Sequence, residues 1–379
     1  MHITDEHRSA ITWSRIVEGG DVVAKALVTH YGFTEALEKV RRAPEQYPQG
    51  WLNRLAGLSA FDDRVLEKLR IRILIPSDDA WPEQLADLGE REPLMLWVRG
   101  EASVLRQRSC AIVGSRACTQ YGSRIASQLA FDLAGDYPII SGGAFGIDAA
   151  AHQGAITAGG STVIVTAGGV ERPYPQAHAQ LYQAVLSNGG AVMSESPVGA
   201  VPARFRFLSR NRIIAALSQA TVVVEAPIRS GALSTARAAM AIGREVGAVP
   251  GNVTMPASDG CHELIRNGGQ LVAGPKHVRE LLAPIGEQLE LGVDTSENST
   301  SGDFLNVIDA SFDPVRERVF DAVPKIQGRD AASIARAAGV SLMQVRVELA
   351  RLAADERVEN NSGLWRKRKL GAAQSMVQQ

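Results

Sequence analysis

Apolar and polar positions follow three different patterns along the chain, and the first pattern ends near residue 70. Up to that point apolar side chains recur three or four positions apart, as at Trp13, Ile16 and Val17. Such spacing places them on one face of a helix, so residues 1–70 are predicted to form a small helical domain. Two extended apolar runs, 71–75 and 94–98, then lead into the next region.

The second pattern consists of short β-branched runs, each followed by a turn and by a segment with helical spacing. The runs are Cys110–Val113, Pro138–Ile140, Thr162–Val165, Ala191–Met193, Thr221–Glu225 and Glu245–Val249. Buried strands that alternate with helices are typical of a mainly parallel sheet covered on both faces. Residues 71–283 are therefore predicted to form an α/β domain with a Rossmann-like, doubly wound sheet.

The third pattern begins with residues 284–311, a polar and acidic stretch whose composition predicts a linker. Beyond it, helical spacing returns in three segments, and Asn360–Gly363 separates two short runs in the manner of a hairpin turn. The three segments lie near 315–323, 331–338 and 341–353. A helix, a helix–turn–helix and a hairpin in this order predict a winged-helix domain over residues 312–379.

Composition limits the classes of function without selecting one. Hydrophobic residues make up 45% of the 379 positions, and the formal net charge is −1, so any basic binding site must be local. The three cysteines, Cys110, Cys118 and Cys261, form no CxxC pair, which predicts neither a disulfide framework nor a metal site. Because the chain shows neither a signal-peptide pattern nor a membrane span, a cytoplasmic location is expected.

Glycine-rich turns follow the predicted strands at the positions where an α/β sheet binds ligands. The first turn contains Gly114 and Arg116, and the second runs from Ser141 through Gly142 and Gly143 to a helix that begins near Gly146. Glycines allow backbone N–H groups to approach a ligand, and a helix N-terminus favours an anion. The spacing is neither a dinucleotide fingerprint nor a Walker A loop. The alternative is that these glycines serve only tight turns and packing.

A local cluster of arginines is the sharper feature. From Ala200 to Pro250 there are seven Arg and two Glu, with no Lys or Asp, so the local charge is 7 − 2 = +5. The dense part of the cluster contains Arg204, Phe205, Arg206, Phe207, Arg210 and Arg212. Guanidinium groups bind phosphates and exposed rings stack on bases of any identity, a combination suited to single-stranded nucleic acid. The alternative is a solvated charged loop whose phenylalanines fill the core.

Two other classes of function remain open from the residues alone. An enzyme that binds or processes nucleotides could use Glu195 or Glu225 as its acid or base, whereas Asp148 and His152 have structural explanations. A duplex-binding regulator could act through the winged helix, because Phe312–Gln379 carries twelve basic and eight acidic residues. The predicted exposed face of its third helix is a poor reader of the major groove, since it offers Met343, Gln344, Val347, Glu348 and Arg351.

Many short motifs, in one order over about 170 residues, resemble the DNA-processing protein DprA (Smf) family. They include Ala111–Arg116, Ser141–Asp148, Ala151–Ala155, Tyr174–Pro175, Ser194–Glu195, Arg210–Ile214, Val223–Ala226, Ser230–Thr235, Gly243–Val246, Val249–Gly251 and Leu264–Gly268. Two positions depart from the family pattern: Leu208 stands where a Pro is expected, and His262 stands near an expected Asn. The first departure could change the rigidity of its segment.

The resemblance implies a non-enzymatic, sequence-tolerant single-stranded DNA-binding protein that is usually dimeric. In the family, such proteins protect incoming strands during natural transformation and help to load RecA recombinase. The flanking regions resemble a SAM-like helical domain and a winged helix, and no cofactor or metal is implied. Carried over motif by motif, the strand-binding residues are Arg116, Ser141, Gly142, Gly143, Arg204, Phe207, Arg210 and Arg212.

Overall fold

The computed structural model of the protein describes residues 3–283 and, except for 317–318, 321, 325–327, 339 and 356, residues 316–368. These residues divide into two units, one within residues 1–290 and the other within residues 291–379. The predicted linker, 284–311, and part of the helix predicted near 315–323 lie outside the described residues. No helix in the described part of the chain is both long and apolar enough to cross a bilayer.

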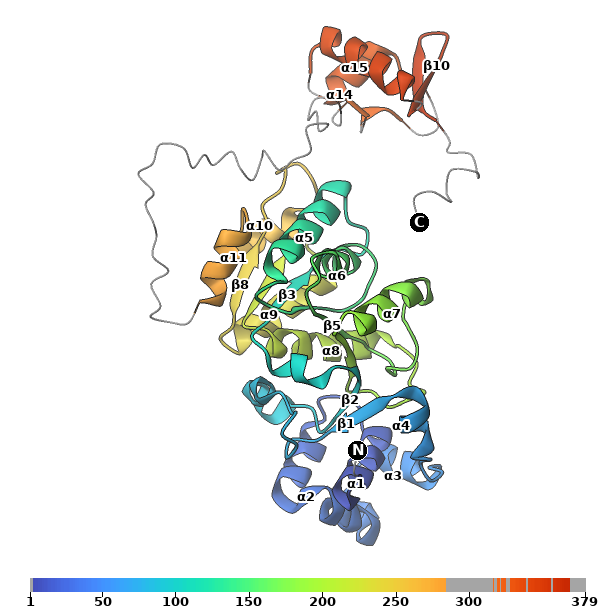
Figure 1. Ribbon diagram of the computed structural model, residues 1–379, viewed down its shortest axis with the longest axis vertical. Coiled ribbons are helices and arrows are strands. Elements are labelled where there is room, and N and C mark those ends of the chain that lie inside the picture. Colours follow the sequence, from blue (N-terminus) through green and yellow to red (C-terminus); the bar gives the residue numbers. More distant parts are fainter. Residues whose placement is uncertain are drawn as a thin grey trace. The chain divides into compact units, whose positions relative to one another are not determined.

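A nine-stranded sheet forms the centre of the first unit, in the order β1-β2-β6-β5-β4-β3-β7-β8-β9 (Figure 1). Every neighbouring pair from β6 to β9 is parallel, whereas β2 is antiparallel to both β1 and β6. The strands are β1 Ile71–Leu74, β2 Leu96–Gly100, β3 Cys110–Val113, β4 Ile139–Ser141, β5 Thr162–Val165, β6 Ala191–Ser194, β7 Ala220–Val223, β8 Glu245–Ala248 and β9 Gln270–Leu271. The predicted α/β class with a mainly parallel sheet is confirmed.

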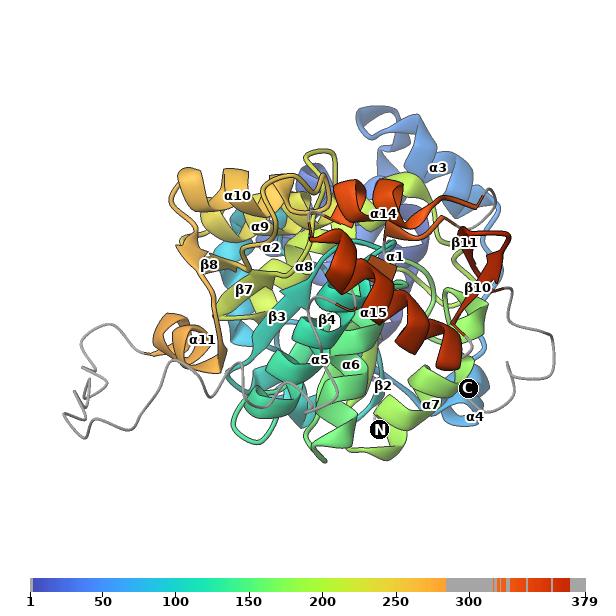
Figure 2. The ribbon, with the colours of Figure 1, turned by 90° about the horizontal axis from the view of Figure 1, so that it is seen from above.

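Helices cover both faces of this sheet (Figure 2). Helices α5, α6 and α11 pack with β3 around one apolar core, which includes Ile112 and Leu129. Helices α8, α9 and α10 pack on the opposite face around a second core, which includes Ile213 and Leu233. The bounds are α5 Gln120–Leu133, α6 Ile147–Thr157, α7 Ala179–Ser187, α8 Arg204–Leu217, α9 Gly231–Ala241, α10 Asp259–Arg266 and α11 Pro275–Leu282.

The arginine cluster is helical, so the alternative of a solvated charged loop was wrong. Arg204 is the first residue of α8, and the helix continues to Leu217. Its second half, Ile213–Leu217, is almost completely buried in the core, which fixes the helix against the sheet. The first half, Arg204–Ser209, has no buried side chain and extends beyond that core. Neither Phe205 nor Phe207 is buried.

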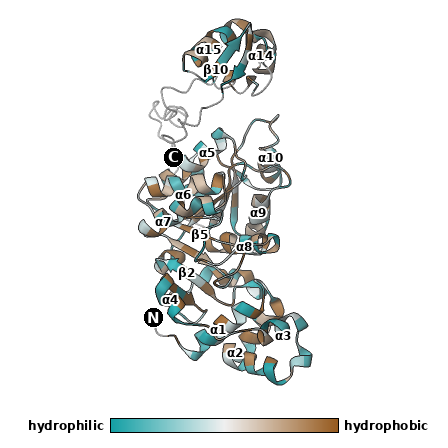
Figure 3. Ribbon diagram, turned by 90° about the vertical axis from the view of Figure 1, so that its right-hand side faces the viewer, coloured by the Kyte–Doolittle hydropathy of each residue, from teal (hydrophilic) through white to brown (hydrophobic). Residues whose placement is uncertain are grey.

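The N-terminal helices share a core with the sheet through Trp13, Trp97 and Tyr182, all at most 2% exposed. They are α1 Asp5–Ile16, α2 Val22–Arg42, α3 Gln49–Ala56 and α4 Arg64–Leu69. Coloured by hydropathy, the outer helical faces carry many hydrophilic residues (Figure 3). The shared core means that the N-terminal region packs against the α/β region within one unit.

The second unit consists of α14 Ala331–Ala338, α15 Leu342–Ala354 and the hairpin β10 Val358–Asn361 with β11 Leu364–Lys367. Val345, Leu349 and Leu352 form the buried side of α15. The predicted exposure of Glu348 was wrong: this side chain is buried, and its carboxylate accepts a hydrogen bond from Arg351 at 2.8 Å. The adjacent arginine makes that burial possible because it offsets the carboxylate charge.

Candidate nucleic-acid interface

A groove of about 730 Å³ lies along the carboxyl ends of β3, β4, β5 and β6. Its walls come from the loops that follow these four strands and from the start of α8. The lining residues are Arg116, Gly142, Ala144, Phe145, Gly168, Gly169, Arg172, Pro173, Tyr174, Pro175, Gln176, Ala200, Val201, Pro202 and Phe207. We call this set the rim groove. In an open α/β sheet this edge is where ligands bind.

Cations and aromatic rings alternate around the rim groove. The guanidinium of Arg116 lies 4.8 Å from the centre of the Phe207 ring, within cation–π distance. Phe207 also packs against Tyr174, with ring centres 5.6 Å apart. Phe145 packs edge-on against His178 at 4.6 Å and stays 47% exposed. Rings that are packed yet accessible can stack on a base with little loss of side-chain freedom.

The loop that carries Arg116 is fixed by the ends of two neighbouring elements. The Ser115 amide donates to the Glu225 carbonyl at 2.7 Å, and the Thr119 amide donates to the Glu225 carboxylate at 2.8 Å. Thr119 also caps α5, with its hydroxyl accepting from the Gly122 amide. The buried carboxylate of Glu225 is therefore engaged in holding the Arg116 loop, and the exposed Arg116 side chain extends from a rigid base.

Ser141 ends β4, and of this serine and the two glycines that follow it only Gly142 is among the lining residues of the groove. Ser141 is fully buried and donates its hydroxyl to the Ile112 carbonyl at 2.7 Å. The Gly142 amide donates to the Asp148 carboxylate at 3.1 Å, so it is not free for a phosphate. A Cβ on Gly142 would lie 2.4 Å from the Arg210 guanidinium, and Gly143 has a φ of +69°. These glycines are required for close packing and a left-handed turn.

Arg210 packs against this segment and is not among the lining residues of the groove. It is 7% exposed, and its guanidinium donates to the Gly142 carbonyl at 2.9 Å and to the Val165 carbonyl. Burial lowers the pKa of Arg210, and the negative charge of Asp148 opposes that shift. Burial likewise raises the pKa of Asp148, against the opposing charge of Arg210. Arg210 therefore joins the carboxyl ends of β4 and β5, and the prediction that it contacts a bound strand is at odds with this position.

Arg212 is also engaged inside the protein. Its guanidinium forms two hydrogen bonds with the Glu195 carboxylate, at 2.7 and 3.0 Å, and its side chain is 4% exposed. This pair is at odds with two expectations. Arg212 does not face the groove, and Glu195, the possible acid or base of an enzyme, is neutralised by its partner. Glu195 and Arg212 lie 17 positions apart in the sequence, so no local motif indicated that they would pair.

Arg204 and Arg116 are the predicted cations that the structure leaves exposed. Arg204 opens α8, and its preceding residue, Ala203, provides no side-chain cap. The first N–H groups of a helix have no intrahelical acceptor and favour an anion. Phe207 is half-buried one turn further along and lines the groove. Three of the predicted residues, Arg116, Arg204 and Phe207, therefore lie at or beside the accessible wall.

Among the groove residues that were not predicted as site residues, Phe145, Arg172 and Tyr174 carry an aromatic ring or a charge. Phe145 occupies the variable position of the glycine-rich motif, and Tyr174 was noted only as part of a family motif. Arg172, with a 79% exposed side chain, follows β5 by seven positions and belongs to no motif. The sequence feature that could have identified these three residues is an aromatic residue or an arginine shortly after a strand. Such residues are also common in surface loops that bind nothing.

His152 has a structural role, in agreement with its sequence interpretation. It is fully buried, and its Nδ1 lies 2.7 Å from the Thr162 hydroxyl. Because that hydroxyl donates to the Ile139 carbonyl, it accepts from Nδ1–H of the imidazole. Burial lowers the pKa of His152 to about 3. The ring is therefore neutral at physiological pH and links α6 to the sheet.

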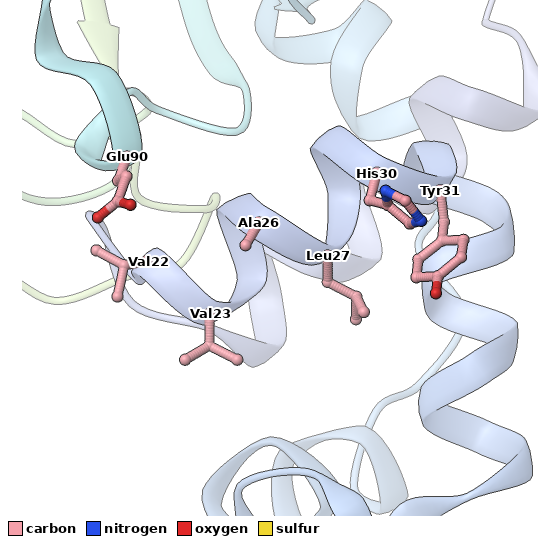
Figure 4. Close-up of a pocket in the computed structure, with 7 residues that line it drawn as sticks. All are labelled: Val22, Val23, Ala26, Leu27, His30, Tyr31 and Glu90. Carbon is pink, nitrogen blue, oxygen red and sulfur yellow. The ribbon is translucent and has the colours of Figure 1, made fainter.

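A second hollow, of about 450 Å³, lies along the outer side of α2 (Figure 4). It is bordered by Val22, Val23, Ala26, Leu27, His30, Tyr31 and Glu90. Among these lining residues there is no lysine or arginine, and the carboxylate of Glu90 would repel a phosphate. The apolar hollow is therefore a poor candidate for binding nucleic acid.

Comparison with known proteins gives matches over most of the chain. The sequence model of the family described as DNA recombination-mediator protein A matches residues 72–283. The chain is 38% identical to the putative DNA processing protein DprA of Mycobacterium tuberculosis over 381 aligned positions, which cover 96% of this chain and 94% of that protein. It is 40% identical to the DNA processing protein DprA of Streptococcus pneumoniae over 201 positions, or 53% of this chain and 71% of that protein.

Two solved structures are similar in fold. The X-ray structure of the Streptococcus pneumoniae protein superposes with a TM-score of 0.62 at 32% identity and covers 74% of this chain and 98% of its own. A structure of DNA processing protein A from Helicobacter pylori, which describes a single-stranded DNA binding mode, gives a TM-score of 0.51 at 27% identity. That match covers 56% of this chain and 95% of the other.

Proposed function

Because the chain belongs to the DNA recombination-mediator protein A family, we propose that its rim groove binds single-stranded DNA with little preference for sequence. The observation that carries this proposal is the exposed Arg116 beside Phe207 and Tyr174 in a groove of about 730 Å³. Cations attract the phosphates of any strand, and aromatic rings stack on any base. The described binding mode of the Helicobacter pylori relative supports the same ligand.

The start of α8 supplies a phosphate position in this proposal. Arg204 is exposed at the positive end of the helix dipole, where no acidic residue of the first turn neutralises it. A cation at this end is unfavourable for the helix by itself. A bound phosphate would accept from the terminal N–H groups and from the Arg204 guanidinium together. The base of that nucleotide would then reach Phe207, one turn along.

The groove also favours binding over catalysis. Glu225 holds the Arg116 loop, and Glu195 is paired with Arg212. Both carboxylates considered for a nucleotide-processing enzyme are thus committed to structural contacts. We therefore propose that the protein acts as a binding protein without a chemical step.

Further roles follow from the family and are part of the proposal. The protein would protect incoming strands in natural transformation and help to load RecA recombinase, with residues 1–70 as a SAM-like domain and residues 312–379 as a winged helix. A homodimer is supported by exposed apolar side chains that follow β7 and β8 or lie in β9, namely Ile228, Val253, Met255 and Leu271. Within the described residues β9 pairs on one side only, with β8, which leaves an edge for association.

Fluorescence anisotropy with labelled strands tests the proposed ligand. Poly-dT and mixed-sequence strands should bind with similar affinity and more tightly than duplex DNA. The slope of log K against log salt should be about −0.7 for each phosphate neutralised. Nucleoside monophosphates should compete weakly, because a single nucleotide fills only part of an open groove. Tight monophosphate binding that displaces the strand would instead support the enzyme alternative, and preferential duplex binding would support the winged-helix regulator.

Replacing Phe207 with alanine should weaken binding to poly-dT by about 1–3 kcal/mol, the usual loss when a stacking platform is removed. The ring also positions Arg116 through a cation–π contact, so removing the ring also frees the Arg116 side chain. The matched control is Phe205→Ala, which removes a 52% exposed ring from the same helix but not from the groove. Equal effects of the two substitutions on anisotropy titrations would argue against stacking on Phe207.

A further inference from the structure

The turn that joins α1 to α2 packs directly against the helix that carries Arg204 and Phe207. The turn consists of Glu18, Gly19 and Gly20, and it lies more than 180 positions before α8 in the sequence. The Ser209 hydroxyl donates to the Gly19 carbonyl at 2.8 Å. The Gly20 amide donates to the Glu195 carboxylate at 3.3 Å, next to Arg212. The N-terminal region therefore reaches α8 by hydrogen bonds.

Two ion pairs reinforce this contact. Arg206 donates from Nε and Nη2 to the two carboxylate oxygens of Glu18, each at 3.0 Å. Glu195 and Arg212 form a second two-bond pair, and Arg212 Nε donates to the Arg91 carbonyl at 2.8 Å. Paired hydrogen bonds between a guanidinium and a carboxylate fix orientation as well as distance. The first pair is half-exposed and the second is almost completely buried.

The glycines of the turn leave no space for larger residues. A Cβ on Gly19 would lie 2.0 Å from Glu195 Oε2 and 3.1 Å from the Ser209 hydroxyl. Gly20 has a φ of +79° and lies against the Arg212 guanidinium. The Glu195 carboxylate cannot move away freely, because movement would break its buried pair with Arg212. The fit of the turn against α8 is therefore close.

The helical repeat separates the two sides of α8. Arg206, Ser209 and Arg212 recur three positions apart and face the turn, whereas Arg204 and Phe207 project from the opposite side. The first half of α8, residues 204–209, has no buried side chain, so the sheet core does not fix it. Hydrogen bonds to the turn supply the constraint that the core does not.

We propose that the Glu18–Gly20 turn is a positioning element for strand binding: it holds the first half of α8 so that Arg204 and Phe207 face the rim groove. This inference rests on the proposed function. It implies that the N-terminal helical region contributes to strand affinity without touching the strand. Any partner that moves this region would change the affinity of the groove.

The test compares Gly19→Ala with Gly50→Ala in the full-length protein. Gly50 lies in the same N-terminal region, and no atom stands within 4 Å of its added Cβ. Gly19→Ala should weaken poly-dT binding about tenfold, a typical coupling between distinct sites, and should make the salt slope less negative by up to about 0.7, because the phosphate contact of Arg204 is displaced. Hydrogen exchange should rise over residues 204–209. Gly50→Ala should leave binding and exchange unchanged.

A milder variant, Glu18→Gln, guards against a general loss of folding. It keeps the shape of the side chain, removes the charge opposite Arg206 and should shift affinity and exchange in the same direction by a smaller factor. If Gly19→Ala and Glu18→Gln bind as the wild type does while Arg116→Ala weakens binding, the positioning proposal is wrong and the function stands. If the wild type does not bind poly-dT, the proposed function itself fails.

Discussion

Replacing Arg116 with alanine is expected to weaken binding to every single strand by about 10- to 100-fold, since a charge-assisted phosphate contact contributes about 1.5–3 kcal/mol. The loss should be the same for poly-dT and for mixed sequences, because a phosphate contact carries no sequence information. The salt slope should become about 0.7 less negative for one lost phosphate contact. Anisotropy titrations at several salt concentrations measure both quantities.

Arg42→Ala is the control for nonspecific charge. Arg42 has a 77% exposed side chain on α2 and lines no part of the rim groove. Both substitutions lower the net charge by one, so a long-range effect of charge alone would appear in both. An Arg116→Ala protein that binds as the Arg42→Ala protein does, with an unchanged slope, would remove the rim groove as the binding site.

Replacing Arg210 with alanine should have a different effect, a loss of folding stability of about 3–5 kcal/mol. Its guanidinium satisfies two carbonyls at the carboxyl ends of β4 and β5 and offsets the buried charge of Asp148. Removing it leaves that carboxylate without a counter-charge in the interior. Urea unfolding measures the loss at pH 7. Any loss of strand binding by the Arg210→Ala protein should then be in proportion to the loss of folded protein. Its salt slope should equal that of the wild type.

The pH dependence identifies the cause of this loss. Burial already raises the pKa of Asp148, and the charge of Arg210 opposes that rise. Without Arg210 the folded-state pKa of Asp148 should rise further above its unfolded value. A raised carboxyl pKa gives stability that is present at low pH and lost as pH increases through that pKa. The deficit of Arg210→Ala should therefore shrink as the pH falls from 7 towards 5.

The double variant Arg210→Ala/Asp148→Asn should recover part of the stability at pH 7, because the uncompensated charge is gone.

Arg172→Ala is the control for the stability loss. It removes an exposed arginine from the groove wall and should leave the free energy of unfolding unchanged within about 0.5 kcal/mol. An Arg210→Ala protein with wild-type stability and a flattened salt slope would place Arg210 in contact with the strand after all.

The expected effects differ between the residues that line the groove and the buried residues beside it. Arg116 and Phe207 line the groove together with Gly142, and Arg204 is exposed at the start of α8. Ser141, Gly143 and Arg210 are buried and are not among the lining residues. Arg212 lies on the far side of α8, where it meets Glu195 and the N-terminal turn. These residues were predicted together as strand-binding residues, but they lie at different depths.

Much of the fold could be predicted from the sequence because strand formation depends on local steric preference. The β-branched runs at 110–113, 162–165 and 191–193 correspond to β3, β5 and β6 within one residue. The antiparallel placement of β2 between β1 and β6 was not predicted. Pairing across the sheet depends on long-range burial, and the extended run at 94–98 did not indicate its neighbours.

The sequence by itself determined the alternation of strands and helices, the glycine turns at the strand ends and the local excess of arginine, since each depends on neighbouring residues. Only the tertiary structure decided which arginines are available. Arg204, Arg210 and Arg212 lie within nine positions, yet one is exposed and two are buried. A helix turns successive residues towards different surroundings, and the counter-charges that engage the buried ones, Asp148 and Glu195, come from distant parts of the chain.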